Sequence, residues 1–272
     1  MGAETTMTKT GGETLRLNLF LARAGIASRR GAEELINEGR VTLNGRKVAK
    51  LATRIDPASD TVRVDGDKVS LNTRKNYYAL YKPREVVSTM KDPEGRNCLS
   101  SFLPAGSRGL FPVGRLDYHS EGLLLLTNDG ELSNRLLHPR YKVEKVYTLK
   151  VKGLPGKEEL DRLRKGIRLE GRKTLPVKIR RLPARETKHT WLEIKMTEGR
   201  KNQLREMFFR IRHPVIKLKR TAVGPVKIGR LRAGQVRTLT QAEVSELLEH
   251  AGLKKSKKRD KGSKGGKREV QK

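Results

Sequence analysis

The sequence predicts a two-part α+β protein. A small N-terminal module of two helices and short strands precedes a larger domain with a mixed, largely antiparallel sheet. In the first part, two short helical stretches are followed by closely spaced β-rich runs with Asn-Gly and Asp-Gly turns. In the second part, many strand-like runs at irregular spacing are interrupted by a few helical stretches. This pattern favours an α+β arrangement over a doubly wound one.

Composition divides the 272 residues into four segments. We expect disorder at 1–13 and 253–272, because neither segment has a periodic apolar pattern and the second is strongly basic. The ordered domains are expected at 14–72 and 76–252, with a short polar linker between them. Two domains agree with the usual size of protein domains.

The first module is predicted from its helix and turn signals. Leu15 and Leu19 lie near one face of the first helix, and Gly25 is a suitable residue to follow its end. Ser28 is a suitable N-cap for the second helix, which Gly39 ends. The Asn-Gly and Asp-Gly dipeptides then predict two tight hairpins.

The larger domain is predicted to contain seven strands and four helices. Its strand-like runs are 77–83, 122–129, 146–153, 176–182, 189–196, 214–224 and 235–240. The helical stretches are 130–138, 157–166, 201–212 and 241–252, and Thr240 with Glu243 forms a capping box before the last. The four consecutive leucines from Leu123 to Leu126 predict a strand that is buried on both faces.

The net charge of +31 and the pI near 10.6 favour a polyanionic partner. We favour a nucleic acid over an anionic membrane or a merely solubilising surface. Six cations cluster within 25 positions around the helix-helix turn and the first hairpin. We predict backbone-phosphate contacts for them rather than a solvated face; they are Arg23, Arg29, Arg30, Arg40, Arg46 and Lys47.

The sequence indicates no cofactor and no metal. A single thiol, Cys98, and five histidines without metal-ligand spacing do not form a zinc site, and one cysteine excludes an intrachain disulfide. Phosphate-binding and dinucleotide-binding glycine motifs are lacking as well. No apolar run approaches the ~20 residues that a membrane span needs. We therefore expect a reducing compartment, the cytoplasm, and no membrane partner.

Asp117 is the main candidate for chemistry. It lies in a glycine-flanked loop before the leucine strand, where a rigid scaffold can hold a carboxylate outward. A turn-forming role explains it equally well at this point. Asp92 and Asp129 are better explained as turn residues. Tyr147, in a strand, is usually a core residue, and Arg205, at the start of a helix, is normally solvated or bound to phosphate.

Two resemblances sharpen this interpretation. The stretch "LNLFLARAGIASRRGAEELINEGRVTLNGRKV" (17–48) resembles the S4 domain, which binds structured RNA mostly through its shape and phosphates. The stretches "GRLDYHSEGLLLLTNDG", "VEKVYTLKVKG" and "TEGRKNQLREMF", in this order, resemble the ribosomal-RNA pseudouridine synthases of the RsuA/RluB branch. The match runs from 15 to 239, and "DPEGR" (92–96) favours members that modify the large subunit, as RluB-like enzymes do.

The second resemblance implies an isomerase that converts uridine to its C-glycoside without cofactor or metal. It places the essential aspartate at Asp117, a tyrosine that stacks on the base at Tyr147, and an arginine that pairs with the aspartate at Arg205. It also implies that Leu218 packs beside the base, and Arg115 could fill the space that the flipped uridine leaves. One residue departs from the family pattern. Glu206 stands where a second basic residue usually follows the arginine.

The favoured interpretation is therefore a monomeric enzyme whose S4-like domain docks on ribosomal RNA or an assembling ribosomal subunit. The alternative is a non-catalytic S4-type RNA-binding or ribosome-assembly protein. Asp117 speaks against it, because a protein that only binds RNA gains nothing from an acid that faces phosphates. A glycoside hydrolase is a third possibility, but it needs a second positioned carboxylate. Glu121 is the nearest candidate, and no feature of the sequence marks it as an acid catalyst.

Overall fold

The computed structural model describes residues 14–71, 74–104, 106–183 and 188–254. Nearly all of the two segments expected to be disordered therefore lies outside the described residues. Within the described ranges, no helix is both long and apolar enough to cross a membrane. The same part of the chain contains no group of three or more His, Cys, Asp or Glu side chains that could hold a metal ion.

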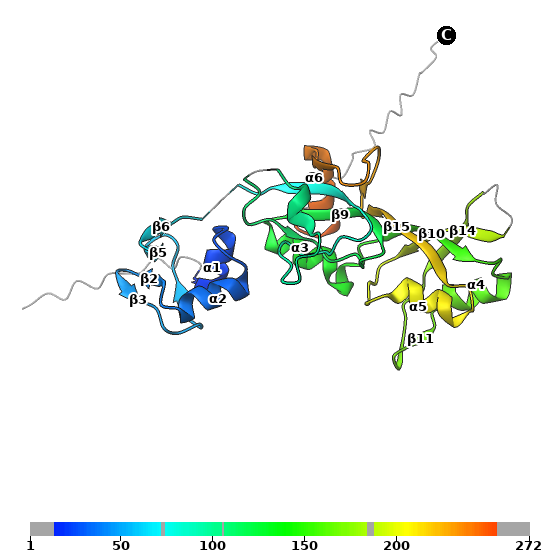
Figure 1. Ribbon diagram of the computed structural model, residues 1–272, viewed down its shortest axis with the longest axis horizontal. Coiled ribbons are helices and arrows are strands. Elements are labelled where there is room, and N and C mark those ends of the chain that lie inside the picture. The colour runs from blue at the N-terminus through cyan, green and yellow to red at the C-terminus, as the bar shows by residue number, and fades with distance from the viewer. Residues whose placement is uncertain (1–13, 72–73, 105, 184–187, 255–272) are drawn as a thin grey trace, which may run out of the picture.

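The N-terminal module consists of two helices packed on short strands, gathered at one end of the molecule (Figure 1). Helices α1 (Leu17–Arg23) and α2 (Arg29–Asn37) lie where the sequence predicts them, except that Leu15, expected in the first helix, belongs to the short strand before it. The Ser28 hydroxyl accepts a hydrogen bond from the Gly31 amide at 3.0 Å, which confirms the predicted N-cap. The strands are β1 (Leu15–Arg16), β2 (Val41–Leu43), β3 (Arg46–Lys47), β4 (Arg54–Ile55), β5 (Val62–Val64) and β6 (Asp67–Val69).

The predicted hairpins of this module are confirmed by its sheet. Strands β2 and β3 pair around Asn44 and Gly45, and β5 pairs with β6 around Asp65 and Gly66. All four turn residues have positive φ, as a type I′ turn requires. The four strands form one antiparallel sheet in the order β3-β2-β5-β6, while β1 pairs separately with β4.

The larger domain is organised around one nine-stranded sheet. Its order is β13-β14-β10-β15-β9-β7-β17, with β16 paired to β15 and β8 to β9. Among these strands only the β15–β9 pair is parallel, so the largely antiparallel sheet is confirmed. The strands are β7 (Tyr77–Lys82), β8 (Phe111–Pro112), β9 (Glu121–Thr127), β10 (Lys145–Lys152), β13 (Lys178–Arg181), β14 (His189–Met196), β15 (Val215–Val223), β16 (Val226–Lys227) and β17 (Val236–Thr238).

The remaining elements surround this sheet. The helices are α3 (Gly130–Leu137), α4 (Lys157–Arg164), α5 (Gln203–Arg210) and α6 (Gln241–His250), with short 3-10 turns η1 (Leu99–Phe102) and η2 (Pro139–Tyr141). Strands β11 (Arg168–Leu169) and β12 (Arg172–Lys173) form a separate hairpin. The capping box predicted before α6 is present, because Thr240 and Glu243 exchange hydrogen bonds.

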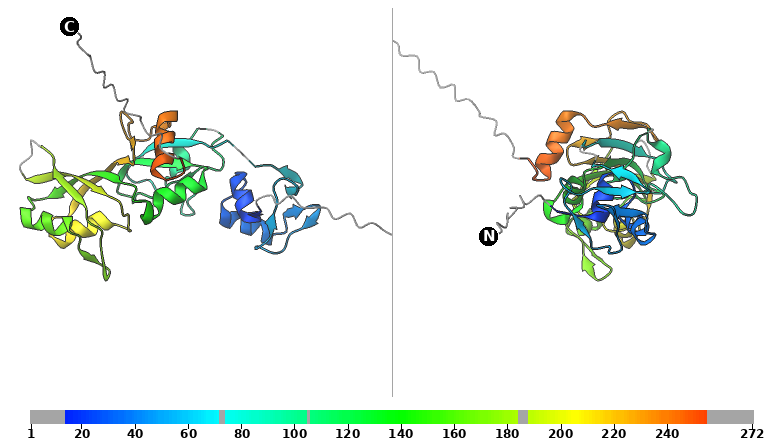
Figure 2. Two further views of the ribbon diagram at one scale, coloured as in Figure 1. Left: turned by 180° about the vertical axis from the view of Figure 1, so that it is seen from behind. Right: turned by 90° about the vertical axis from the view of Figure 1, so that its left-hand side faces the viewer.

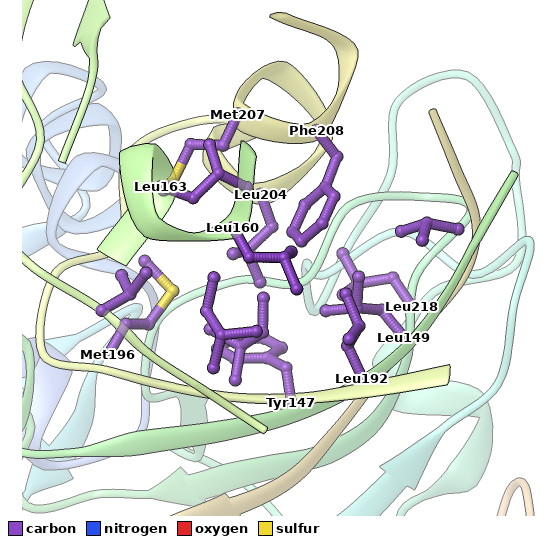
Figure 3. Packing of buried hydrophobic residues seen from close by; sticks show 14 of the residues in the cluster. Tyr147, Leu149, Leu160, Leu163, Leu192, Met196, Leu204, Met207, Phe208 and Leu218 are labelled. Carbon is purple, nitrogen blue, oxygen red and sulfur yellow. The ribbon is translucent and has the colours of Figure 1, made fainter. Parts of the chain in front are cut away.

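Helices α4 and α5 cover the part of the sheet that β10, β14 and β13 form, as both Figure 1 and Figure 2 show. Leu160 of α4 and Phe208 of α5 are almost fully buried against Leu149 and Leu192 of the sheet (Figure 3). Burial of side chains of this size stabilises the fold by about 1.5–3 kcal/mol each. This core fixes the position of β10 relative to the N-terminus of α5, and both elements contribute to the site described below.

Strand β9 crosses the centre of the domain and is buried on both faces, as predicted. Leu123 and Leu125 pack in one core cluster with Leu132 of α3, while Leu124 and Leu126 pack in another. Asp129, expected to be an ordinary turn residue, instead caps α3. Its carboxylate accepts hydrogen bonds from two backbone amides at the start of that helix and from the Tyr77 hydroxyl.

Candidate active site

Asp117 lies in the loop between β8 and β9, at the boundary of two cavities. The larger has a volume of about 740 Å³ and is open to solvent. The smaller, about 140 Å³, is lined partly by residues of the sheet. Within the described residues, no hydrogen bond or ion pair engages the Asp117 carboxylate. The Asp117 carbonyl accepts a hydrogen bond from the Ser120 amide at 3.0 Å, so this residue does begin a turn. Its carboxylate takes no part in that turn and is free to meet a ligand from either cavity.

Hydrogen bonds to a neighbouring loop hold the backbone on both sides of Asp117. The Ser88 hydroxyl donates to the Leu116 carbonyl at 2.7 Å and accepts from the Leu116 amide at 3.0 Å. The Glu85 amide donates to the Tyr118 carbonyl at 2.7 Å. Sequence analysis missed Ser88, since a lone serine in a loop carries no signal. Its role depends on a contact between segments 28 residues apart.

Lys82 holds the start of this neighbouring loop, residues 83–88, through hydrogen bonds to its backbone. Its side chain is fully buried, and its ammonium donates to the carbonyls of Pro83 and Val86 at 2.8 and 2.7 Å. Burial lowers the pKa of Lys82 to about 8, although the charges of Asp117 and Glu121 act in the opposite direction. Sequence analysis did not identify Lys82. The signal that could have identified it is its position, since a lysine at the end of a buried apolar strand is unusual.

Arg205, at the start of α5, clamps the end of the Asp117 loop. Its guanidinium donates to the His119 carbonyl at 3.2 Å and to the Ser120 hydroxyl at 3.3 Å. The expected direct pairing with Asp117 is not present, because no ion pair within 4.0 Å joins them among the described residues. Burial lowers the pKa of Arg205, and the negative charge of Asp117 partly opposes this. Arg205 therefore couples to Asp117 through charge and through the loop backbone.

The smaller cavity brings together three further predicted residues. Tyr147 of β10 and Leu218 of β15 are both buried and both line it, and exposed Arg115 lines its entrance together with Asp117. Glu206, which departs from the family pattern, is exposed on α5 and lines neither cavity. A small cavity with an aromatic ring and a leucine in its wall, polar and basic side chains around them and an acid at its mouth suits one heterocyclic base.

Glu121, the second carboxylate that a glycoside hydrolase would need, does not face the site. It lines neither of the cavities that Asp117 borders. Its carboxylate instead accepts a hydrogen bond from the Tyr81 hydroxyl at 3.0 Å. A second carboxylate, Asp92, does line the larger cavity, but it is ion-paired with Arg96 at 2.9 Å. Neither Glu121 nor Asp92 is therefore available as the second acid, and the hydrolase interpretation loses its support.

The six cations predicted to contact RNA are all exposed on the N-terminal module. Arg29 and Arg30 occupy the first turn of α2, where the positive end of the helix dipole adds to their field. Arg40 differs, because its guanidinium binds Asp65 at 2.6 Å and Glu38 at 3.1 Å. A phosphate would have to compete with these two acids for Arg40.

Comparison with known proteins identifies both domains. Residues 15–62 match the S4 domain, and residues 76–209 match the RNA pseudouridylate synthase family. A protein of Aquifex aeolicus named as an RNA pseudouridine synthase is 45% identical over 88% of this chain and 96% of its own. The chain belongs to the RNA pseudouridine synthase family. It is therefore an isomerase that binds RNA and converts uridine to pseudouridine, and the non-catalytic alternative is not favoured.

Two further relatives agree with this membership. The Bacillus subtilis protein named ribosomal large subunit pseudouridine synthase B is 46% identical over 85% of this chain and 95% of its own. A crystal structure of a pseudouridylate synthase superimposes with a TM-score of 0.61 at 28% identity, covering 86% of this chain and 99% of that protein. The predicted combination of an S4 domain with a pseudouridine synthase domain is confirmed.

Proposed function

We propose that this pseudouridine synthase modifies uridine in the ribosomal RNA of the large subunit, with Asp117 as its essential catalytic residue. The observation that carries the proposal is an unpaired carboxylate at the mouth of a base-sized cavity, in a member of this family. The large-subunit substrate is supported by the name of the Bacillus subtilis relative. We further propose that the protein acts as a monomer in the cytoplasm.

The proposed chemistry assigns one task to each residue. Asp117 stabilises or captures C1′ when the bond from C1′ to N1 of the base breaks, as carboxylates do at glycosidic centres. Tyr147 and Leu218 hold the base inside the smaller cavity, and Arg205 keeps the Asp117 loop in place. Arg115 occupies the position that the flipped uridine leaves in the RNA stack.

The test of this function is pseudouridine mapping on transcribed ribosomal RNA of both subunits. Purified protein is incubated with each RNA, or with immature particles, and pseudouridines are located by carbodiimide-dependent stops of reverse transcription. We expect new stops in the large-subunit RNA. Stops confined to small-subunit RNA would contradict the substrate, and an absence of stops on all RNAs and particles would contradict the function.

We also propose that Arg23, Arg29, Arg30, Arg46 and Lys47 contact RNA phosphates. Each phosphate contact adds about one unit to the slope of log affinity against log salt. Replacing Arg29 and Arg30 together by Gln should therefore reduce this slope by about two units without changing the free energy of unfolding, because both side chains are exposed. The slope is measured by filter binding at several salt concentrations.

The control for this prediction is Arg40→Gln. Because acids already engage Arg40, we expect the salt slope of this variant to remain within half a unit of the wild type. If the salt slope of the Arg29 and Arg30 double variant is unchanged, the N-terminus of α2 is not part of the RNA-binding surface.

A further inference from the structure

Two cations occupy positions of the central sheet that normally hold apolar residues. Lys145 and Tyr147 are two residues apart in β10, so their side chains share a face of the sheet. Arg220 of β15 is paired directly with Tyr147, which places it on the same face. Both cations are therefore beside the tyrosine that lines the smaller cavity, and both line that cavity themselves.

Neither cation is neutralised within the described residues. Lys145 is 8% exposed and Arg220 is 4% exposed. The Arg220 Nε donates to the Leu123 carbonyl at 2.7 Å, but its Nη2 is buried without a partner. In the same part of the chain, no hydrogen bond or ion pair engages the Lys145 ammonium. Buried Lys and Arg side chains are rare unless they are paired, so a partner from outside the chain is indicated.

The two cations also act on each other. Burial and the charge of Arg220 both lower the pKa of Lys145. Among the residues that the structure describes, Asp117 is the single acid that lines this cavity, and it lies at the boundary with the larger one. The interior of the smaller cavity is therefore a region of uncompensated positive charge, where a negative group is stabilised strongly because water is largely excluded.

The volumes of the two cavities indicate which part of the RNA supplies the negative group that these cations would stabilise. The larger cavity of about 740 Å³ is open and bordered by Arg96, Lys201 and Arg205, so it suits the sugar and its phosphates. The smaller cavity of about 140 Å³ has Tyr147 and Leu218 in its wall and suits the base. A base is neutral in RNA, but it becomes an anion when it leaves the sugar with the electron pair of the broken bond.

We infer that Lys145 and Arg220 are catalytic residues that hold uracil in its detached, anionic form. This inference rests on the proposed function. When the N1–C1′ bond breaks, its electron pair stays on N1 and the charge spreads to O2, O4 and C5, while Asp117 stabilises C1′. After the base rotates, C5 supplies an electron pair to C1′, the C5 proton leaves, and N1 gains a proton. Both cations donate hydrogen bonds to the exocyclic oxygens O2 and O4 of the detached base.

The test compares two leaving groups in the same RNA. Target RNA carrying uridine or 5-fluorouridine is reacted with excess enzyme in a single turnover, and loss of the N-linked nucleoside is followed by digestion and mass spectrometry. Fluorine withdraws electrons, so the detached 5-fluorouracil anion needs less help from the protein. We expect Lys145→Gln and Arg220→Gln to slow the uridine reaction by roughly 10²–10³-fold. The same variants should slow the 5-fluorouridine reaction less than tenfold.

Controls separate this role from a structural one. Lys152→Gln removes an exposed lysine from the same strand and should leave both reactions unchanged. Arg220→Lys retains the charge and should recover much of the activity lost in Arg220→Gln. Equal defects on both substrates, or a defect seen only in RNA affinity, would overturn the inference while leaving the proposed function intact. A wild type that converts neither substrate would instead overturn the proposed function.

Discussion

Asp117→Asn is expected to reduce pseudouridine formation by at least ~10³-fold, because the amide cannot stabilise or capture C1′ as a carboxylate does. The substitution keeps the size of the side chain. Because the carboxylate has no hydrogen bond or ion pair among the described residues, no protein contact is broken. RNA affinity should therefore remain within a few-fold of the wild type. Single-turnover assays at saturating enzyme, with filter binding on the same RNA, measure the two quantities separately.

Glu121→Gln is the matched control for Asp117→Asn. It neutralises a carboxylate four residues further along, which lines neither cavity and is held by Tyr81. We expect its activity to stay within tenfold of the wild type. Full activity of Asp117→Asn would show that the essential acid is elsewhere, and inactivity of Glu121→Gln would revive a mechanism with two carboxylates.

Gly122→Ala is expected to lower the free energy of unfolding by more than ~4 kcal/mol, the range reached by the most damaging single substitutions. Gly122 has φ +110°, and a Cβ there would lie 2.3 Å from the Arg220 carbonyl oxygen and 2.7 Å from the Arg220 amide nitrogen. These are backbone atoms, so β9 and β15 would have to separate where they pair in parallel. Denaturant unfolding followed by circular dichroism measures the change.

Gly171→Ala distinguishes this clash from backbone strain alone. Gly171 also has a positive φ, +77°, but a Cβ there would meet no atom within 4 Å. We expect a loss of about 1–2 kcal/mol, which is the cost of the left-handed conformation for a residue with a side chain. Equal losses in the two variants would mean that the contact between Gly122 and Arg220 does not matter.

Local sequence signals predicted most of the elements that position the site. The caps at Ser28 and Thr240 and the Asn-Gly and Asp-Gly turns depend on residues within a few positions of each other, and the structure confirms them. The four leucines of β9 are confirmed as a strand buried on both faces. The role of Asp129 was misassigned, because a cap and a turn have the same local composition.

The contacts around Asp117 could not be predicted from the sequence. Ser88 holds the backbone of this loop through a contact with a segment 28 residues away, which no local pattern encodes. Arg205 reaches the same loop but binds its backbone rather than Asp117 itself. In each case the geometry depends on where a distant segment packs, so side-chain identity alone did not predict the partner.

The sequence by itself determined the family, the S4 and catalytic domains, and the candidate acid, because these depend on motifs in their linear order. Only the tertiary structure decided what surrounds Asp117. Lys145 follows the inward alternation of β10, yet its proximity to Arg220 comes from the pairing of strands separated by about seventy residues. A buried cation is neutralised only if the fold brings an acidic side chain within reach of it. The lack of a counter-charge beside Lys145 among the described residues is therefore decided by the tertiary structure and not by the local sequence.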